Sequence, residues 1–163
     1  MVKYLITIII SFFFIISCQK ELSVTDTYQS SNKIIFIDTV QKNINLNGTI
    51  KGIYSDSFLD LLSYWSDNNI KTNGFDGLLE INLISISSSE LLTENGTRVE
   101  LELELDFIIS KTALDSKTLI NFKGNEFFEI LGNFSLNEKN IEVKNIMKKL
   151  VDRLSYKLSK EIS

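Results

Sequence analysis

The chain has 163 residues, with no histidine, no proline and one cysteine. The absence of histidine excludes a Ser-His-Asp or Cys-His nucleophile and an imidazole general base. One cysteine cannot close an internal disulfide or, without histidine, build the usual Cys/His zinc site. The chain is 44% hydrophobic and 23% charged, which is typical of a globular protein, and its length fits one domain. The formal net charge of −4 argues against nucleic acid as a partner.

The N-terminus has the pattern of an export signal. Lys3 supplies a short positive region, and an almost uninterrupted apolar stretch follows from Leu5 to Ile16. A helix of about twelve residues rises only about 18 Å, whereas the hydrocarbon core of a bilayer measures about 30 Å. A signal peptide over residues 1–17 is therefore predicted in preference to a helix that spans the membrane.

The only cysteine, Cys18, directly follows this segment. Ile15, Ile16 and Ser17 precede it, which resembles a bacterial lipobox. A small side chain at Ser17 gives the signal peptidase access to the bond before Cys18, and the thiol of Cys18 takes up the diacylglyceryl group. Two or three acyl chains, at about 0.8 kcal/mol per buried methylene, would hold the protein on a bilayer. We predict cleavage between Ser17 and Cys18 and lipidation of Cys18. The alternatives are a signal peptide without lipid or an N-terminal anchor helix.

The residues after the cysteine suggest where the protein is delivered and how it is attached. Gln19 follows Cys18, and the resemblance to lipoprotein sorting signals implies an outer-membrane location facing the periplasm, because no aspartate marks inner-membrane retention. Residues 18–33 are polar and lack periodicity, which predicts a flexible lipid-anchored tether. A partly ordered edge strand is the alternative. Residues 34–163 are predicted to form a single α+β domain.

The first part of this domain is predicted to contain one strand and one helix. Residues 34–37 form a short β-branched run that indicates a strand. The stretch from Asp38 to Gly52 is rich in Asn, Gln and Gly and is predicted to be a loop. A helix capped by Ser55 or Ser57 is then predicted to end near Asn69. Its apolar side chains fall at helical spacing: Phe58, Leu61, Leu62 and Trp65.

The second part is predicted to contain three strands joined by short turns. Residues 75–87 are largely apolar, residues 98–109 alternate between apolar and charged, and residues 118–130 supply the third strand. Asn95-Gly96 is a hairpin signal between the first two strands, and residues 113–116 form the turn to the third.

Residues 138–162 are predicted to form the closing helix, because leucine and other apolar residues make a stripe along it. The element order is strand, helix, three-stranded meander and helix. Strands joined by short turns pair antiparallel, so both helices should cover one face of a mixed sheet. The predicted fold class is an α+β sandwich of two layers.

A row of carboxylates is the sharpest constellation in the sequence. It lies on the polar side of the second predicted strand of the meander: Glu100, Glu102, Glu104 and Asp106. Neighbours in such a row lie about 7 Å apart, a spacing that a metal site or a glycosidase pair could use. A solvated sheet face is the favoured interpretation, so no catalytic residue, metal ligand or cofactor is predicted.

The closing helix is basic. Lys144, Lys148, Lys149 and Arg153 are candidates for contact with an anionic glycolipid or an acidic partner surface. A solvated helix face is the alternative, and it ranks first for most of these residues.

The signal, the charged meander and the long final helix together resemble the LPS-assembly lipoprotein family (LptE), in its alphaproteobacterial form. The resemblance runs from Phe75 to Ile162. Its segments are FDGLLEINLISISSSELLTENGTRVELELELDFIIS, SKTLINFKGNEFFEILGNFS and EVKNIMKKLVDRLSYKLSKEI. The residues FLDLL at 58–62 stand where the family has its first helix. The segment after Cys18 departs from the family pattern, because it reads Gln-Lys-Glu-Leu where family members often have a Gly-Phe-x-Pro-Leu-like segment.

The resemblance implies a lipoprotein without enzymatic activity that plugs and supports an LptD-like β-barrel of the outer membrane. That barrel inserts lipopolysaccharide into the outer leaflet, and the lipoprotein could bind the glycolipid itself. Two alternatives remain open. One is another small envelope lipoprotein, such as an auxiliary subunit of a lipid ABC transporter. The other is an enzyme that uses the carboxylate row.

Overall fold

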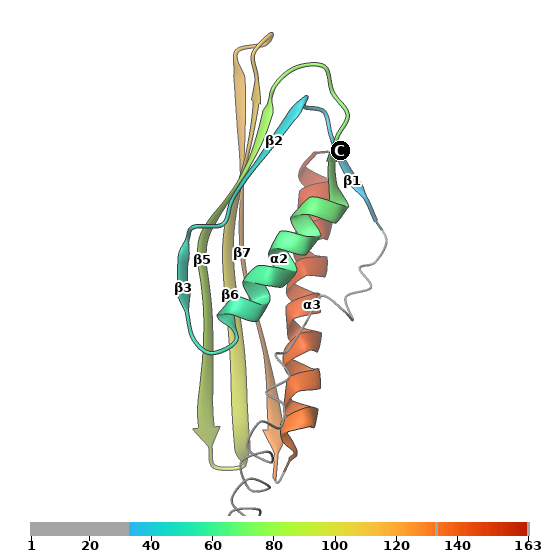
Figure 1. Cartoon of the computed structure of the whole chain (residues 1–163). Coiled ribbons are helices and arrows are strands. Elements are labelled where there is room, and N and C mark those ends of the chain that lie inside the picture. Colours follow the sequence, from blue (N-terminus) through green and yellow to red (C-terminus); the bar gives the residue numbers. More distant parts are fainter. Residues whose placement is uncertain (1–32, 133, 163) are drawn as a thin grey trace, which may run out of the picture.

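A computed structural model describes residues 33–132 and 134–162. The predicted signal peptide, and the predicted tether except for Lys33, lie outside the described residues. In the described part a long sheet forms one layer, and helices α2 and α3 cover one of its faces (Figure 1). The predicted fold class is confirmed: an α+β sandwich with a mixed sheet.

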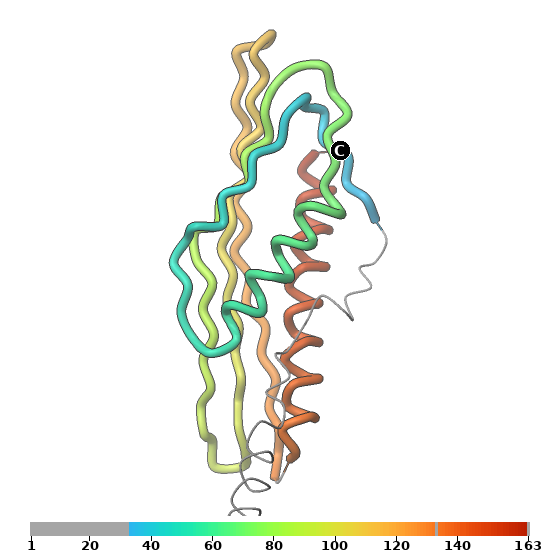
Figure 2. Tube along the Cα trace, viewed as in Figure 1, coloured from blue at the N-terminus to red at the C-terminus, as the bar shows by residue number. Residues whose placement is uncertain are grey.

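The centre of the sheet is the predicted meander. It consists of β5 (Leu78–Thr93), β6 (Gly96–Lys111) and β7 (Ser116–Leu131), each 16 residues long. The strands pair antiparallel along nearly their whole length, and their two hairpin turns lie at opposite ends of the sheet (Figure 2). The three predicted strands are confirmed, but the first was predicted to begin three residues too early, and all of them end or begin too far from the hairpin turns because pairing continues into each turn. The two-residue turn at 94–95 leads straight into Gly96.

The predicted loop from Asp38 to Gly52 is wrong, because it contains two strands. β2 (Gln41–Asn45) and β3 (Thr49–Lys51) both pair parallel with β5, which makes the sheet mixed. Most of their side chains are polar and exposed, so no hydrophobic alternation marks them in the sequence. Backbone pairing with the edge of β5 decides their conformation, which shows how context overrides β-propensity.

The first predicted strand is confirmed as β1 (Ile35–Ile37), but it does not join the main sheet. It pairs parallel with β4 (Ile70–Thr72), a strand that the sequence did not predict. Ile35, Ile37 and Ile70 are buried in the common core. This small second sheet therefore holds the start of the described chain against the end of α2.

Helix α2 (Ser55–Asn69) has the predicted bounds, but its ends are held differently. Its N-cap is Tyr54, which makes no side-chain cap hydrogen bond, so neither predicted serine caps the helix. At the other end the ammonium of Lys42 donates to the carbonyls of Ser66 at 2.7 Å and Ile70 at 3.0 Å. A cation there satisfies free carbonyls and interacts favourably with the helix dipole.

Helix α3 (Leu136–Glu161) confirms the predicted closing helix and begins two residues earlier than predicted. Ser135 and Glu138 form a capping box: the Ser135 hydroxyl accepts from the Glu138 N–H, and the Glu138 carboxylate accepts from the Ser135 N–H at 2.7 Å. That backbone hydrogen bond lowers the pKa of the Glu138 carboxyl. The cap fixes the start of α3 a few residues after β7 ends.

The core fills the space between the two helices and the sheet. Trp65 of α2 packs edge-on against Phe107 of β6, with the ring centroids 6.4 Å apart. Its indole Nε1 donates to the hydroxyl of Ser155 on α3 at 2.9 Å, so this buried polar group has a partner. One side chain therefore joins both helices to the sheet.

Helix α3 approaches β7 closely at Gly124. A Cβ atom at this position would lie 2.8 Å from the Phe122 ring and 3.1 Å from Leu150 Cδ2. Both distances are shorter than ordinary contacts, so the packing of α3 on β7 depends on the missing side chain.

We expect Gly124→Val to lower the free energy of unfolding by about 1–3 kcal/mol, because the new side chain overlaps Phe122 and Leu150. Urea unfolding followed by circular dichroism measures the change. Lys123→Val is the matched control. Its side chain lies on the other face of the sheet and is 76% exposed, so stability should change by less than about 0.5 kcal/mol. Equal losses in the two variants would contradict this account.

Candidate contact surfaces

The residues predicted for processing and lipid attachment, Ser17 and Cys18, lie outside the described residues. Their roles therefore stay predictions. Within the part of the chain that the structure describes, no helix combines the length and the hydrophobicity needed to cross a membrane. The remaining candidates lie on the sheet and on α3.

The face of the meander opposite the helices, which we call the open face, carries the predicted carboxylate row. On β6 the apolar side chains from Val99 to Phe107 point to the core, so the intervening residues point to the open face. The row therefore runs along the middle strand, between polar residues of β5 and β7. The prediction that these carboxylates share one face is confirmed.

Every carboxylate of the row already has a polar partner. Hydrogen bonds and ion pairs join Glu100 to Asn125 at 3.4 Å, Glu102 to Ser87 at 3.0 Å, Glu104 to Lys123 at 3.6 Å, and Asp106 to Asn121 at 2.8 Å. These partners come from β5 and β7, the two strands that flank the row. The row is thus part of a cross-strand network, and such pairs contribute a few tenths of a kcal/mol each.

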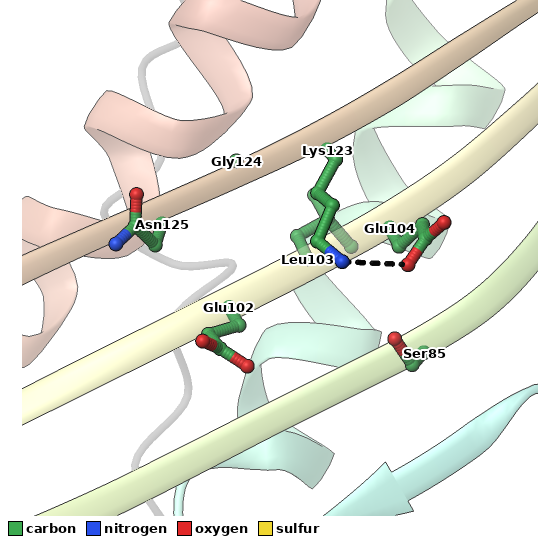
Figure 3. A pocket seen from close by; sticks show the side chains of 7 residues that line it. All are labelled: Ser85, Glu102, Leu103, Glu104, Lys123, Gly124 and Asn125. Atoms are coloured by element: carbon green, nitrogen blue, oxygen red, sulfur yellow. Dashed lines mark ion pairs between the residues drawn. The ribbon is translucent and has the colours of Figure 1, made fainter.

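A shallow cavity of about 280 Å³ lies within this network (Figure 3). Its lining comes from three strands: Glu102 and Glu104 lie on the middle strand β6, Lys123 and Asn125 on β7, and Ser85 on β5 (Figure 3). None of the described residues forms a cluster of three or more His, Cys, Asp or Glu that could hold a metal ion. The chemistry available in the cavity is hydrogen bonding and charge pairing.

One end of the open face carries a cluster of contacts around Arg98 that the sequence did not predict. The guanidinium of Arg98 lies 3.9 Å from the centre of the Phe127 ring and forms ion pairs with Glu129 at 3.5 Å and Glu100 at 3.8 Å. Residues on neighbouring strands bring these groups together, so only the strand register could have revealed the contact.

The four basic residues predicted on the closing helix do not form one patch. At 100° per residue, Lys144 and Lys148 lie on one flank of the buried stripe of α3, and Lys149 and Arg153 lie on the other. Lys149 and Arg153 are exposed, whereas Lys144 and Lys148 are half-buried. Their contact with an anionic glycolipid or partner stays a prediction, and one flat surface cannot meet all four.

Arg153 binds groups of its own domain. Its guanidinium donates to the carboxylate of Glu126 at 2.7 Å and to the backbone carbonyl of Asn125 at 2.9 Å. One helical turn later, Lys157 donates to the carbonyl of Asn121 at 2.5 Å. Both cations therefore bind the backbone of β7, a role that the sequence pattern did not indicate.

Exposed apolar side chains gather at the end of the sheet that carries the hairpin between β5 and β6, which we call the apolar end. Its exposed members come from β5, β7 and α3: Leu91, Leu92, Leu131, Leu136 and Ile141. Leu92 alone is 89% exposed. A groove of about 430 Å³ lies between the end of β7 and the start of α3. Exposed apolar side chains gathered at one end of a domain make that end a candidate contact surface.

Comparison with known proteins gives only distant similarities. No family model matches the chain, and no curated protein does. Among solved structures, the chain is similar to a minor lipoprotein from Acinetobacter baumannii (14% identity, TM-score 0.42, covering 75% of this chain and 89% of that one). It is also similar to the rare lipoprotein B from Shewanella oneidensis (16% identity, TM-score 0.43, covering 75% and 96%). A third is a neuraminyllactose-binding hemagglutinin homologue from Helicobacter pylori (10% identity, TM-score 0.40). Similarities this low carry no argument about function.

We expect the domain to fold without the charges of the carboxylate row. Converting Glu100, Glu102 and Glu104 to Gln and Asp106 to Asn keeps the shape and most hydrogen bonding of each side chain. The free energy of unfolding at neutral pH should therefore change by less than about 1 kcal/mol per site. Urea unfolding of the single and fourfold variants measures this. A loss of several kcal/mol at one site would show that the network does more than cover the sheet.

Proposed function

We propose that this protein is a lipid-anchored lipoprotein of the bacterial envelope that works by contact and not by catalysis. The observation that carries the proposal is the position of the single cysteine. Cys18 follows an apolar segment too short to span a bilayer and has a small residue, Ser17, directly before it. A thiol at this position, with no second cysteine to pair with, fits acylation.

We further propose that the contact is with an outer-membrane β-barrel of the LptD type, in the assembly of lipopolysaccharide. The resemblance of residues 75–162 to the LPS-assembly lipoprotein family supports this. The arrangement of the domain agrees with such a role, because it presents two different contact surfaces. One is the polar open face, about 16 residues long, and the other is the apolar end.

The proposed lipid anchor is tested by identifying the first residue of the mature protein and its modification. We expect mass spectrometry to find Cys18 as the first residue, with acyl chains on its thiol. Cys18→Ala should leave the chain unacylated and its signal uncleaved. The matched control is Cys18→Ala with Ser23→Cys, which restores a thiol five residues outside the lipobox and should stay without lipid. An unmodified Cys18, or Cys18→Ala processed and held in the membrane as before, would overturn the anchor.

The partner is tested by extraction of the acylated chain in mild detergent. We expect an LptD-type barrel to co-purify in about equal amounts, and depletion of the chain should reduce lipopolysaccharide at the cell surface. Recovery of the chain without a barrel would count against the proposal. Co-purification with a permease and a periplasmic lipid-binding protein would instead identify an auxiliary subunit of a lipid ABC transporter.

A further inference from the structure

Strand β7 has a long outer edge. It lies at the end of the order β2-β5-β6-β7, so within the described residues only β6 pairs with it (Figure 2). At 16 residues it is much longer than the five or six of an average strand. Long edge strands present unpaired N–H and C=O groups to any other strand, and native proteins usually cover or charge them.

Two side chains of α3 cover the centre of this edge. The carbonyls of Asn121 and Asn125 accept from Lys157 at 2.5 Å and from Arg153 at 2.9 Å. Because backbone groups alternate in direction along a strand, the odd-numbered residues of β7 point their N–H and C=O groups outward. The two cations therefore occupy two central acceptors of the row that a neighbouring strand would need.

On either side of Lys123, the side chains of β7 make its outer edge complementary to a second copy of itself. When two β7 strands pair antiparallel about a two-fold axis at Lys123, Lys117 of one copy faces Glu129 of the other and Leu119 faces Phe127. All four side chains are exposed on the open face. Opposite charges and apolar-aromatic pairs directly across from one another stabilise antiparallel strands. A two-fold axis repeats each pair, as an isologous interface requires.

We propose that the outer edge of β7 is a pairing surface for a second copy of this chain, and that Arg153 and Lys157 hold it closed. Like charge at Lys123, which faces its own copy on the axis, opposes pairing to the same extent in every chain that keeps this lysine. This proposal rests on the strand register and the α3 contacts, and it does not depend on the proposed function.

The test removes the cationic side chains of Arg153 and Lys157 from the full-length chain, purified in detergent. In excess detergent micelles, light scattering should find native chains monomeric and Arg153→Ala/Lys157→Ala chains dimeric, with dimer affinity raised at least tenfold. A zero-length carbodiimide cross-linker should then join Lys117 to Glu129. These residues are twelve positions apart on one strand, about 40 Å, so the product can only form between copies.

Two controls separate edge pairing from loss of charge. Lys149→Ala/Lys160→Ala removes the same charge from the exposed side of α3 and should leave the chain monomeric. Lys123→Pro in the double variant removes an outward N–H without taking one from the β6 ladder, and it should abolish the dimer. If the double variant fails to fold by circular dichroism, Lys157→Ala alone keeps the Arg153–Glu126 pair and should still give the cross-link.

Two results would overturn the proposal. One is a folded double variant that stays monomeric at the concentrations of the light-scattering measurement. The other is a dimer without the Lys117–Glu129 cross-link, or one that persists with Lys123→Pro, since either would place the contact elsewhere on the molecule.

Discussion

The close approach of α3 to the sheet is the contact on which the architecture depends. The missing side chain at Gly124 lets the helix approach β7 closely, and the apolar stripe of α3 packs against the inward side chains of the meander. The gain is hydrophobic burial, at about 25 cal/mol per Å² of apolar surface removed from water. Because both α2 and α3 lie on this one side, the other face of a long sheet is left to solvent. The carboxylate network on the open face follows from that asymmetry.

The same helix also determines the state of the sheet edge. Its buried stripe fixes the distance to β7, and the flank of that stripe then carries Arg153 and Lys157 to the strand carbonyls. Long cationic side chains suit this position, because their stems lie along the protein surface while their charged ends reach the backbone. The sequence suggests that the basic residues of α3 contact outside partners. In the structure, two of them instead bind the backbone of β7 within the domain. Charge counts alone cannot distinguish these two uses.

Periodicity made the meander and both helices predictable, because each buries one face against the core. The alternation from Val99 to Phe107 and the helical spacing from Phe58 to Trp65 are signals of that burial. β2 and β3 carry no such signal, since they bury few side chains and exist by pairing with β5. The sequence did not reveal the Arg98–Phe127 contact, or the contacts of Arg153 and Lys157 with β7, for a related reason. They join residues far apart in the sequence, and their geometry depends on strand register and helix rotation.

If the proposed partner is a β-barrel, a closed edge of β7 has a particular value. Nascent barrel strands expose the same unpaired backbone groups as β7, and any open edge nearby can capture them. With the edge covered, contact is directed to side-chain surfaces: the open face, with its fixed pattern of hydrogen-bonding groups, and the apolar end. Side-chain recognition discriminates between partners, whereas backbone pairing accepts almost any extended strand. In this view the basic flank of α3 contributes to specificity by removing the least selective contact that the fold offers.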